Sequence, residues 1–419
     1  MASETDKAWL AAVFSFVVVA DLFVAGGVLW TSQIRAGHVF VDFFMMWSSA
    51  RYVLELGMVG FYDAEPLRAF QSILLGAPHG WHPFPYPPIF LFAVLPLGLL
   101  PYFWSYAVAM IGSMAGLIAA AWRKPTALFI AALLTSPAAV VNFLYGHNGF
   151  FSAALFAGGA RLLRDRPIAA GVLFGLLCYK PQLALAVPVA LLAARAWTTL
   201  ASAALTALFA SLASLAVFGV RAWQDWLAFL PFFSKTVLAH GDEFFAKMSS
   251  LTPALLRIGV PFPATMAVQF VVAAAVLVAL WLAFRRGARG SAAGAMLLAA
   301  PFLVTPYAYS YDLPLVAVAV LWLGGELFER GARPAERIAL TLGWIAPLAA
   351  MFPLPPALAP AVPLALGACF AVAARRCLTA RRSGADGMPV AVLAQAMTGP
   401  AAAGENHLAV LRHPAKTTP

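Results

Sequence analysis

The sequence predicts an all-α integral membrane protein that crosses the bilayer about twelve times. Of its 419 residues, 63% are hydrophobic and 11% are charged, and the mean hydropathy is +0.85. Globular domains carry about 25% charged residues, so the chain lacks the polar surface that a soluble domain of this length needs. Apolar runs of about 20 residues recur along nearly the whole chain, which is the pattern of membrane-spanning helices.

The positive charges orient these runs in the membrane. A net charge of +10 is compatible with nucleic-acid binding, but the arginines lie in short clusters between apolar runs and form no basic face, so we exclude that function. If 89–121 crosses once, the positive-inside rule places nearly every cluster and both termini in the cytoplasm. The expected spans are 8–30, 89–121, 126–145, 150–163, 168–179, 183–194, 197–218, 264–284, 292–304, 313–328, 339–351 and 356–372.

The spans form one multi-pass transmembrane domain over 1–382. Its first span, 8–30, is too long for the apolar core of a signal peptide and is expected to be an uncleaved anchor. Residues 383–419 are rich in Ala, Gly, Pro and Thr and are expected to be a disordered cytoplasmic tail. Three widely spaced cysteines argue against a disulfide framework or a metal site.

The polar and aromatic segments all fall on the predicted outer side. They are a long first loop, 31–88, expected to contain juxtamembrane helices, a second large loop, 219–263, and several short turns between spans. ATP and nucleotide sugars are absent outside the cell. A group-transfer enzyme on that side therefore needs a lipid-carried donor.

Short motifs in these outer segments resemble those of glycosyltransferase family 87, over about 42–314. The motifs, in order along the chain, are Asp42-Phe43, Ser48-Ser49-Ala50-Arg51, Phe61-Tyr62-Asp63, Tyr86-Pro87-Pro88, Gly146-His147-Asn148-Gly149, Tyr179-Lys180-Pro181-Gln182 and Tyr311-Asp312.

The resemblance implies a GT-C type membrane glycosyltransferase that works at the outer leaflet of the cell membrane. Similar members take a sugar from a polyprenyl phosphate and generally invert its anomeric centre, with an aspartate early in the first outer loop as base. Here that residue is Asp42. The sugar is a hexose or pentose, mannose by analogy, and the acceptor is a lipid or glycan. Mannosyl-transferring members often have a histidine in the late motif, where this chain has Tyr311-Asp312.

Asp42 is also the best base on chemical grounds. It is followed by Phe43, Phe44, Met45 and Met46, and apolar surroundings raise the pKa of a carboxyl group, which suits a general base. The alternative is that Asp42 caps the amino terminus of a juxtamembrane helix.

Lys180 is the leading candidate for the donor phosphate. It lies at an outer span end, against the positive-inside pattern, where its ammonium can neutralise a leaving phosphate. The alternative is that it extends to the lipid headgroups. The other candidate site residues are His147 and Arg257 for the phosphate, and Asn148, Gln182, Asp63, Tyr311 and Asp312 for the sugar or the acceptor; Asp63 alternatively caps a helix.

No metal or other cofactor is expected. His79 and His82 flank Trp81 but lack the further carboxylate or histidine of a metal site. Two rival functions stay open, a lipid or sugar transporter (or flippase) and a membrane glycan ligase or polymerase. The first would move its substrate without forming a product, and the second would form a much larger product.

Overall fold

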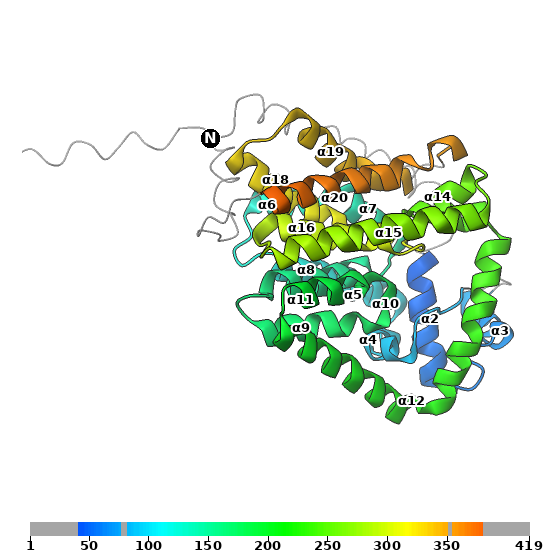
Figure 1. Ribbon diagram of the computed structural model, residues 1–419. Coiled ribbons are helices and arrows are strands. Elements are labelled where there is room, and N and C mark those ends of the chain that lie inside the picture. The colour runs from blue at the N-terminus through cyan, green and yellow to red at the C-terminus, as the bar shows by residue number, and fades with distance from the viewer. Residues whose placement is uncertain (1–40, 77–81, 351–353, 380–419) are drawn as a thin grey trace, which may run out of the picture.

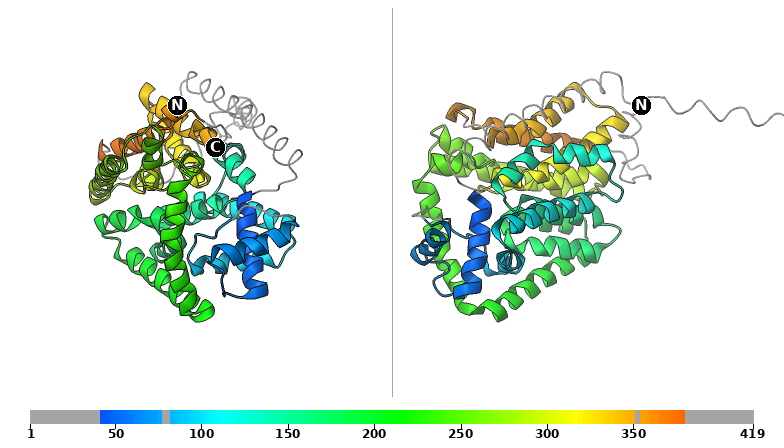
Figure 2. Two further views of the ribbon diagram at one scale, coloured as in Figure 1. Left: turned by 90° about the vertical axis from the view of Figure 1, so that its right-hand side faces the viewer. Right: turned by 180° about the vertical axis from the view of Figure 1, so that it is seen from behind.

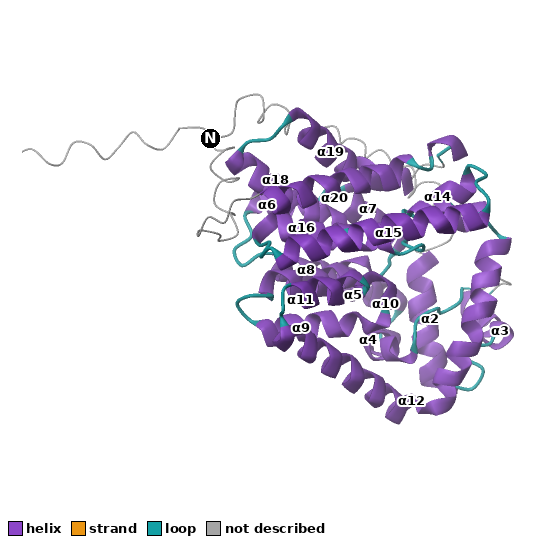
Figure 3. Cartoon of the chain, in the orientation of Figure 1, coloured by secondary structure: helices purple, strands orange, loops and turns teal. Residues whose placement is uncertain are grey.

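The computed structural model describes residues 41–76, 82–350 and 354–379 of the chain. The expected first span, 8–30, and the expected tail, 383–419, lie outside the described residues. The regular secondary structure of these residues is helical (Figure 3), apart from one isolated bridge between Met248 and Tyr309.

The helices follow one another with short connections. In chain order they are α2 (Val41–Leu56), α3 (Ala64–Leu75), η2 (Pro88–Phe90), α4 (Leu91–Gly98), α5 (Tyr102–Ala121), α6 (Ala127–Leu134), α7 (Pro137–Tyr145), α8 (Gly149–Leu162), α9 (Pro167–Leu176), η3 (Leu177–Tyr179), α10 (Pro181–Ala184), α11 (Ala186–Ala193), α12 (Trp197–Ala239), α13 (Asp242–Phe245), α14 (Leu251–Arg257), α15 (Phe262–Arg285), α16 (Gly290–Ala299), α17 (Pro301–Val304), η4 (Ser310–Asp312), α18 (Pro314–Arg330), α19 (Pro334–Ile345), η5 (Ala346–Ala350), η6 (Pro356–Leu358) and α20 (Ala361–Thr379).

Five helical segments of the described residues are long and apolar enough to cross a membrane, or six if the bent pair α6 and α7 is one span. The twelve expected crossings are not shown. Several expected spans are short helices instead, such as the 10-residue α9 and α16. A helix of that length is about 15 Å long, half the thickness of a hydrocarbon core of about 30 Å. The five long segments are Tyr102–Ala121, Trp197–Ala239, Phe262–Arg285, Ser310–Arg330 and Pro356–Thr379.

The apolar stretch 89–121 divides into a short and a long helix. Helix α4 has 8 residues, about 12 Å of helix, whereas α5 has 20 residues and is one of the candidate spans. The break between them is fixed to α2, because the Trp47 indole donates to the Leu100 carbonyl at 3.0 Å. This division favours a single crossing by α5.

Helix α18 lies at the centre of the bundle, packed against α8, α16 and α19. Most of its side chains are buried, as expected for a helix that is apolar on all sides. Helix α12 forms an outer edge of the molecule (Figure 2). Its first half exposes Leu205, Phe209 and Leu212, which suits contact with lipid.

The two ends of the bundle differ. The connections that follow α5, α8, α11, α15 and α18 gather at the left of Figure 1, whereas α2 and the second half of α12 run across the right-hand end. Helix α12 turns at Gly219, whose φ of 83° is non-helical. Beyond this turn the Trp226 indole donates to the Pro85 carbonyl at 3.2 Å. The expected end of a span at residue 218 thus coincides with a real change of direction.

Candidate active site

A turn between α7 and α8 forms the framework of the site. Helix α7 ends at Gly146, which adopts a left-handed conformation with φ 68° and donates its N–H to the Asn142 carbonyl at 2.9 Å. A Cβ at position 146 would lie 2.6 Å from the Cβ of Phe43. The glycine therefore lets the start of α2, which carries Asp42, pack directly on this turn.

The next glycine, Gly149, allows the segment before α18 to approach this turn. A Cβ at Gly149 would lie 1.7 Å from the Tyr311 carbonyl oxygen and 2.6 Å from Asn142 Oδ1. The Gly149 N–H donates to Asn142 Oδ1 at 3.1 Å. Two chain segments more than 150 residues apart in sequence thus meet backbone to backbone, and the absence of a side chain at Gly149 allows it.

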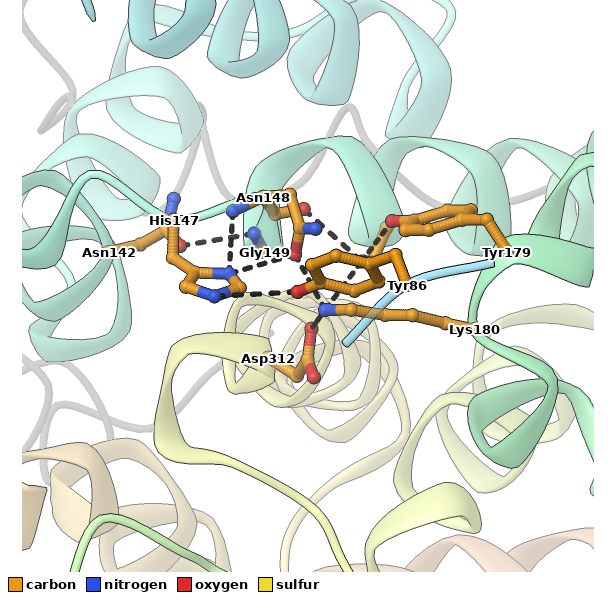
Figure 4. A network of polar contacts seen from close by, with 9 residues as sticks. Tyr86, Asn142, His147, Asn148, Gly149, Tyr179, Lys180 and Asp312 are labelled. Carbon is orange, nitrogen blue, oxygen red and sulfur yellow. Dashed lines mark hydrogen bonds and ion pairs between the residues drawn. The ribbon is translucent and has the colours of Figure 1, made fainter. Parts of the chain in front are cut away.

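His147 is buried in the middle of this turn (Figure 4). Its Nδ1 accepts the Asn148 backbone N–H at 2.9 Å, and its Nε2 lies 3.4 Å from the Tyr86 hydroxyl. Its ring stacks on Tyr311 with centroids 3.4 Å apart and an interplanar angle of 10°. Burial and the nearby Lys180 hold the pKa of His147 well below its usual 6.5, so the ring is neutral.

Tyr309 extends this stack, because its ring lies 5.1 Å from that of Tyr311 at an interplanar angle of 6°. His147, Tyr311 and Tyr309 therefore form a ladder of parallel rings, which we call the aromatic ladder. The Tyr309 segment is held from the other side by loop 219–263. Ser249 N–H donates to the Ala308 carbonyl at 2.7 Å, and Ser310 N–H donates to the Lys247 carbonyl at 2.9 Å.

Lys180 lies next to the Tyr311 ring of the aromatic ladder and is 1% exposed. Its ammonium is 2.7 Å from Asp312 Oδ1 and donates to Asn148 Oδ1 at 2.6 Å (Figure 4). It also lies 4.8 Å from the centre of the Tyr311 ring. Burial lowers the pKa of Lys180, against the attraction of Asp312. An unpaired buried charge is very unfavourable, so the ammonium and Asp312 depend on each other.

Asp42 approaches the aromatic ladder from α2. Its carboxylate is half-buried, and no hydrogen bond or ion pair to it is found among the described residues. Burial raises the pKa of Asp42 to about 6, partly offset by the positive charge of Lys247. The same carboxylate interacts electrostatically with Tyr145, which places it close to the end of α7. A carboxyl group with this pKa is partly deprotonated near neutral pH.

The structure brings together five of the predicted site residues and places two others, Gln182 and Asp63, apart. Gln182 is exposed on α10, and Asp63 is exposed at the amino-terminal cap position of α3, where its side chain makes no capping hydrogen bond. Arg257 lines a small cavity with Ser249 and Ser310, next to the segment of the aromatic ladder, and its guanidinium donates to the Leu354 carbonyl at 3.0 Å. The residues brought together are His147, Asn148, Lys180, Tyr311 and Asp312, with Asp42 beside them.

Some members of the site were not predicted. Tyr86 contacts His147, and the Ser152 hydroxyl lies 2.7 Å from the Tyr179 hydroxyl and 3.5 Å from Lys180 Nζ. Ser152 follows Asn148 by four residues and so lies on the same helix face, a signal that the sequence contains. Nothing local in the sequence links Tyr86 to a histidine 61 residues later.

Comparison with known proteins shows to which family the chain belongs. The model of glycosyltransferase family 87 matches residues 84–306, which is more than half of the chain. The chain belongs to glycosyltransferase family 87. It is therefore a membrane glycosyltransferase. No curated protein and no solved structure matches the chain.

The family 87 match covers part of the site. It includes the His147 turn and Lys180, whereas Asp42, Tyr311 and Asp312 lie outside residues 84–306. The geometry connects the two groups, because Asp312 is the ion-pair partner of Lys180 and Tyr311 stacks on His147.

Proposed function

We infer that this family 87 enzyme transfers a hexose or pentose, mannose by analogy, from a polyprenyl phosphate to a lipid or glycan acceptor at the outer leaflet. The observation that carries the proposal is the Asp42 carboxylate, which is half-buried, unpaired among the described residues and has a pKa of about 6. It lies beside the parallel rings of the aromatic ladder, a surface that suits the apolar face of a sugar.

The proposed reaction is a single displacement with inversion. Asp42 takes the proton of the acceptor hydroxyl as that oxygen forms a bond to C1 of the donor sugar. The bond between C1 and the phosphate oxygen breaks, and its electron pair leaves with the polyprenyl phosphate. The aromatic ladder orients the sugar.

The role proposed for Lys180 is to hold the aromatic ladder in place. Its ammonium is committed to Asp312 and Asn148 and lies against the Tyr311 ring. A cation for the donor phosphate has to be accessible near Asp42, and Lys247 meets this requirement because it is exposed and acts on the Asp42 carboxylate. We therefore propose Lys247 as the phosphate partner in place of Lys180, with Arg257 as a secondary candidate. His147, which is buried and stacked on Tyr311, is proposed to belong to the aromatic ladder and not to the phosphate site.

The sidedness proposed from the charges fits the arrangement of the bundle. The arginine-bearing connections gather at one end, and α2 and the second half of α12 cross the other (Figure 1). This supports basic connections in the cytoplasm, where both termini are also proposed to lie, with the active site outside.

The first prediction concerns Asp42. Asp42→Asn keeps the size of the side chain but cannot accept the proton, so we expect transfer to fall by about 10²–10⁴-fold, the usual contribution of a general base. Membrane vesicles incubated with labelled polyprenyl-phosphate sugars measure the transfer.

The matched control is Asp225→Asn, which removes a carboxylate paired with Arg221 on α12 and is expected to transfer normally. Wild-type rates for Asp42→Asn would show that another group is the base. Movement of the labelled lipid across the vesicle membrane without any product would instead favour a transporter.

A further inference from the structure

A hollow lies at the end of the bundle away from Asp42 (Figure 1). It has a volume of about 750 Å³ and lies between the carboxyl-terminal ends of α5 and α8 and the connections that follow them. Its lining combines three arginines with apolar side chains: Ala115, Ile118, Ala119, Trp122, Arg123, Pro125, Arg161, Leu162 and Arg166. We call it the arginine hollow.

The charges of the arginine hollow are strongly unbalanced. Arg123, Arg161 and Arg166 line it, and Lys124 and Arg164 are their neighbours in sequence. Asp165, which pairs with Arg123, is the only acidic residue in 115–166. The Arg161 Nε–H donates to the Ala120 carbonyl at 2.5 Å, which fixes its guanidinium at the rim. Guanidinium groups bind phosphate oxygens in pairs of parallel hydrogen bonds, so a phosphate complements this excess.

The apolar part of the hollow lies on a candidate membrane span. Ala115 and Ala119 are exposed on α5, which is followed at once by Trp122 and Arg123. A molecule in this hollow therefore meets small apolar side chains on the membrane side and guanidinium groups where the span ends. An amphiphile with an anionic head and a hydrocarbon tail has this order of polarity, and a free phosphate or nucleotide does not.

We propose that the arginine hollow binds the headgroup of an anionic phospholipid from the leaflet opposite the active site. The phosphodiester lies among Arg123, Arg161 and Arg166, and an acyl chain runs along Ala115 and Ala119 of α5. This site is separate from the transferase chemistry, because none of its residues contacts the aromatic ladder or its ion pair.

The test is lipid retention by the full-length protein in nanodiscs of phosphatidylcholine with increasing phosphatidylglycerol, followed by native mass spectrometry. Each guanidinium of the hollow can bind the same phosphate by charge-assisted hydrogen bonds, which arginines outside the hollow cannot do. We therefore expect the triple variant Arg123→Gln/Arg161→Gln/Arg166→Gln to weaken phosphatidylglycerol binding by about 100-fold. The matched control removes three exposed arginines of another connection, Arg285→Gln/Arg286→Gln/Arg289→Gln, and is expected to lose far less.

A second variant leaves the charges in place. Ala115→Trp fills the hollow from α5 and is expected to reduce phosphatidylglycerol binding while phosphatidylcholine nanodiscs still hold a folded protein. Equal lipid loss in the two triple variants overturns the proposal, and so does unchanged binding by Ala115→Trp. Displacement of the lipid by millimolar inorganic phosphate would show that the ligand is a free anion and not a phospholipid.

Discussion

The charge of Lys247 acts on the Asp42 carboxylate. Burial sets the pKa of Asp42 at about 6, and the Lys247 charge keeps it from rising further. A general base acts when it is deprotonated. Transfer is therefore expected to fall as the pH drops through about 6.

The pH profile of kcat/KM, measured with Lys247→Gln, tests this coupling. Without the lysine charge the pKa of Asp42 rises, so the acid limb of the profile moves to higher pH, and the KM for the donor increases if Lys247 also meets its phosphate. The control is Lys235→Gln, an exposed lysine of α12, which should leave the limb in place. An unmoved limb in Lys247→Gln would contradict the coupling.

The ion pair of Lys180 and Asp312 is buried. Both side chains are almost fully buried, 1% and 4% exposed, and removal of one partner leaves the other uncompensated. Lys180→Met or Asp312→Leu alone is expected to cost about 3–5 kcal/mol of unfolding free energy.

The double variant Lys180→Met/Asp312→Leu buries no charge, so we expect it to be more stable than either single variant in thermal unfolding in detergent. Additive losses in this cycle would show that the two side chains act independently. Reduced transfer by a well-folded double variant, with Asp42 intact, would support the positioning role of the pair.

The elements of the site meet because two glycines permit close approach. In Gly149→Ala the new Cβ would collide with the Tyr311 backbone oxygen at 1.7 Å, and a backbone atom cannot turn aside as a side chain does. We expect this variant to separate the segment before α18 from α8 and to lose both stability and transfer.

Gly112→Ala is the matched control, since a Cβ on that glycine of α5 meets no atom within 4 Å. It is expected to fold as the wild type does or slightly better, because Gly costs about 1 kcal/mol relative to Ala in a helix interior. Thermal unfolding of both variants compares them directly. Equal stability would mean that the close approach at Gly149 is not required.

Long apolar elements were predictable from the sequence, and short ones were not. The span expected at 264–284 appears as α15, Phe262–Arg285, because unbroken hydrophobicity marks a helix that crosses the bilayer. The expected spans at 168–179 and 183–194 appear as short helices interrupted at Lys180. Hydropathy reports that such a segment is apolar, but the helix breaks depend on contacts with the rest of the bundle.

The candidate site was also only partly predictable from the sequence. Lys180 stood out in the sequence because it breaks the charge pattern, yet its partner is 132 residues away, and no local spacing predicts that pairing. The role that we propose for it consequently changes from a phosphate ligand to a residue that holds the aromatic ladder in place. Gly146-His147-Asn148-Gly149 was recognised as a motif, and its glycines have the physical reason that they admit Phe43 and Tyr311.

At the scale of the whole molecule, the arrangement of the basic connections makes a prediction about sidedness. In a chain whose cysteines Cys178, Cys369 and Cys377 are replaced by alanine, Glu65→Cys on α3 should react with a membrane-impermeant thiol reagent on intact cells. Arg286→Cys, after α15, should react only after the membrane is opened. Mass tagging measures both, and the reverse pattern would place the active site in the cytoplasm.

The ion pair across the site also has a consequence for biogenesis. Lys180 is synthesised well before Asp312 leaves the ribosome. A lysine within the bilayer without a partner costs a few kcal/mol, so the segment around Lys180 is expected to stay at the headgroup surface until α18 arrives. The last central helix to be made would then draw the lysine inward, and the active site would assemble only when nearly the whole chain has been inserted.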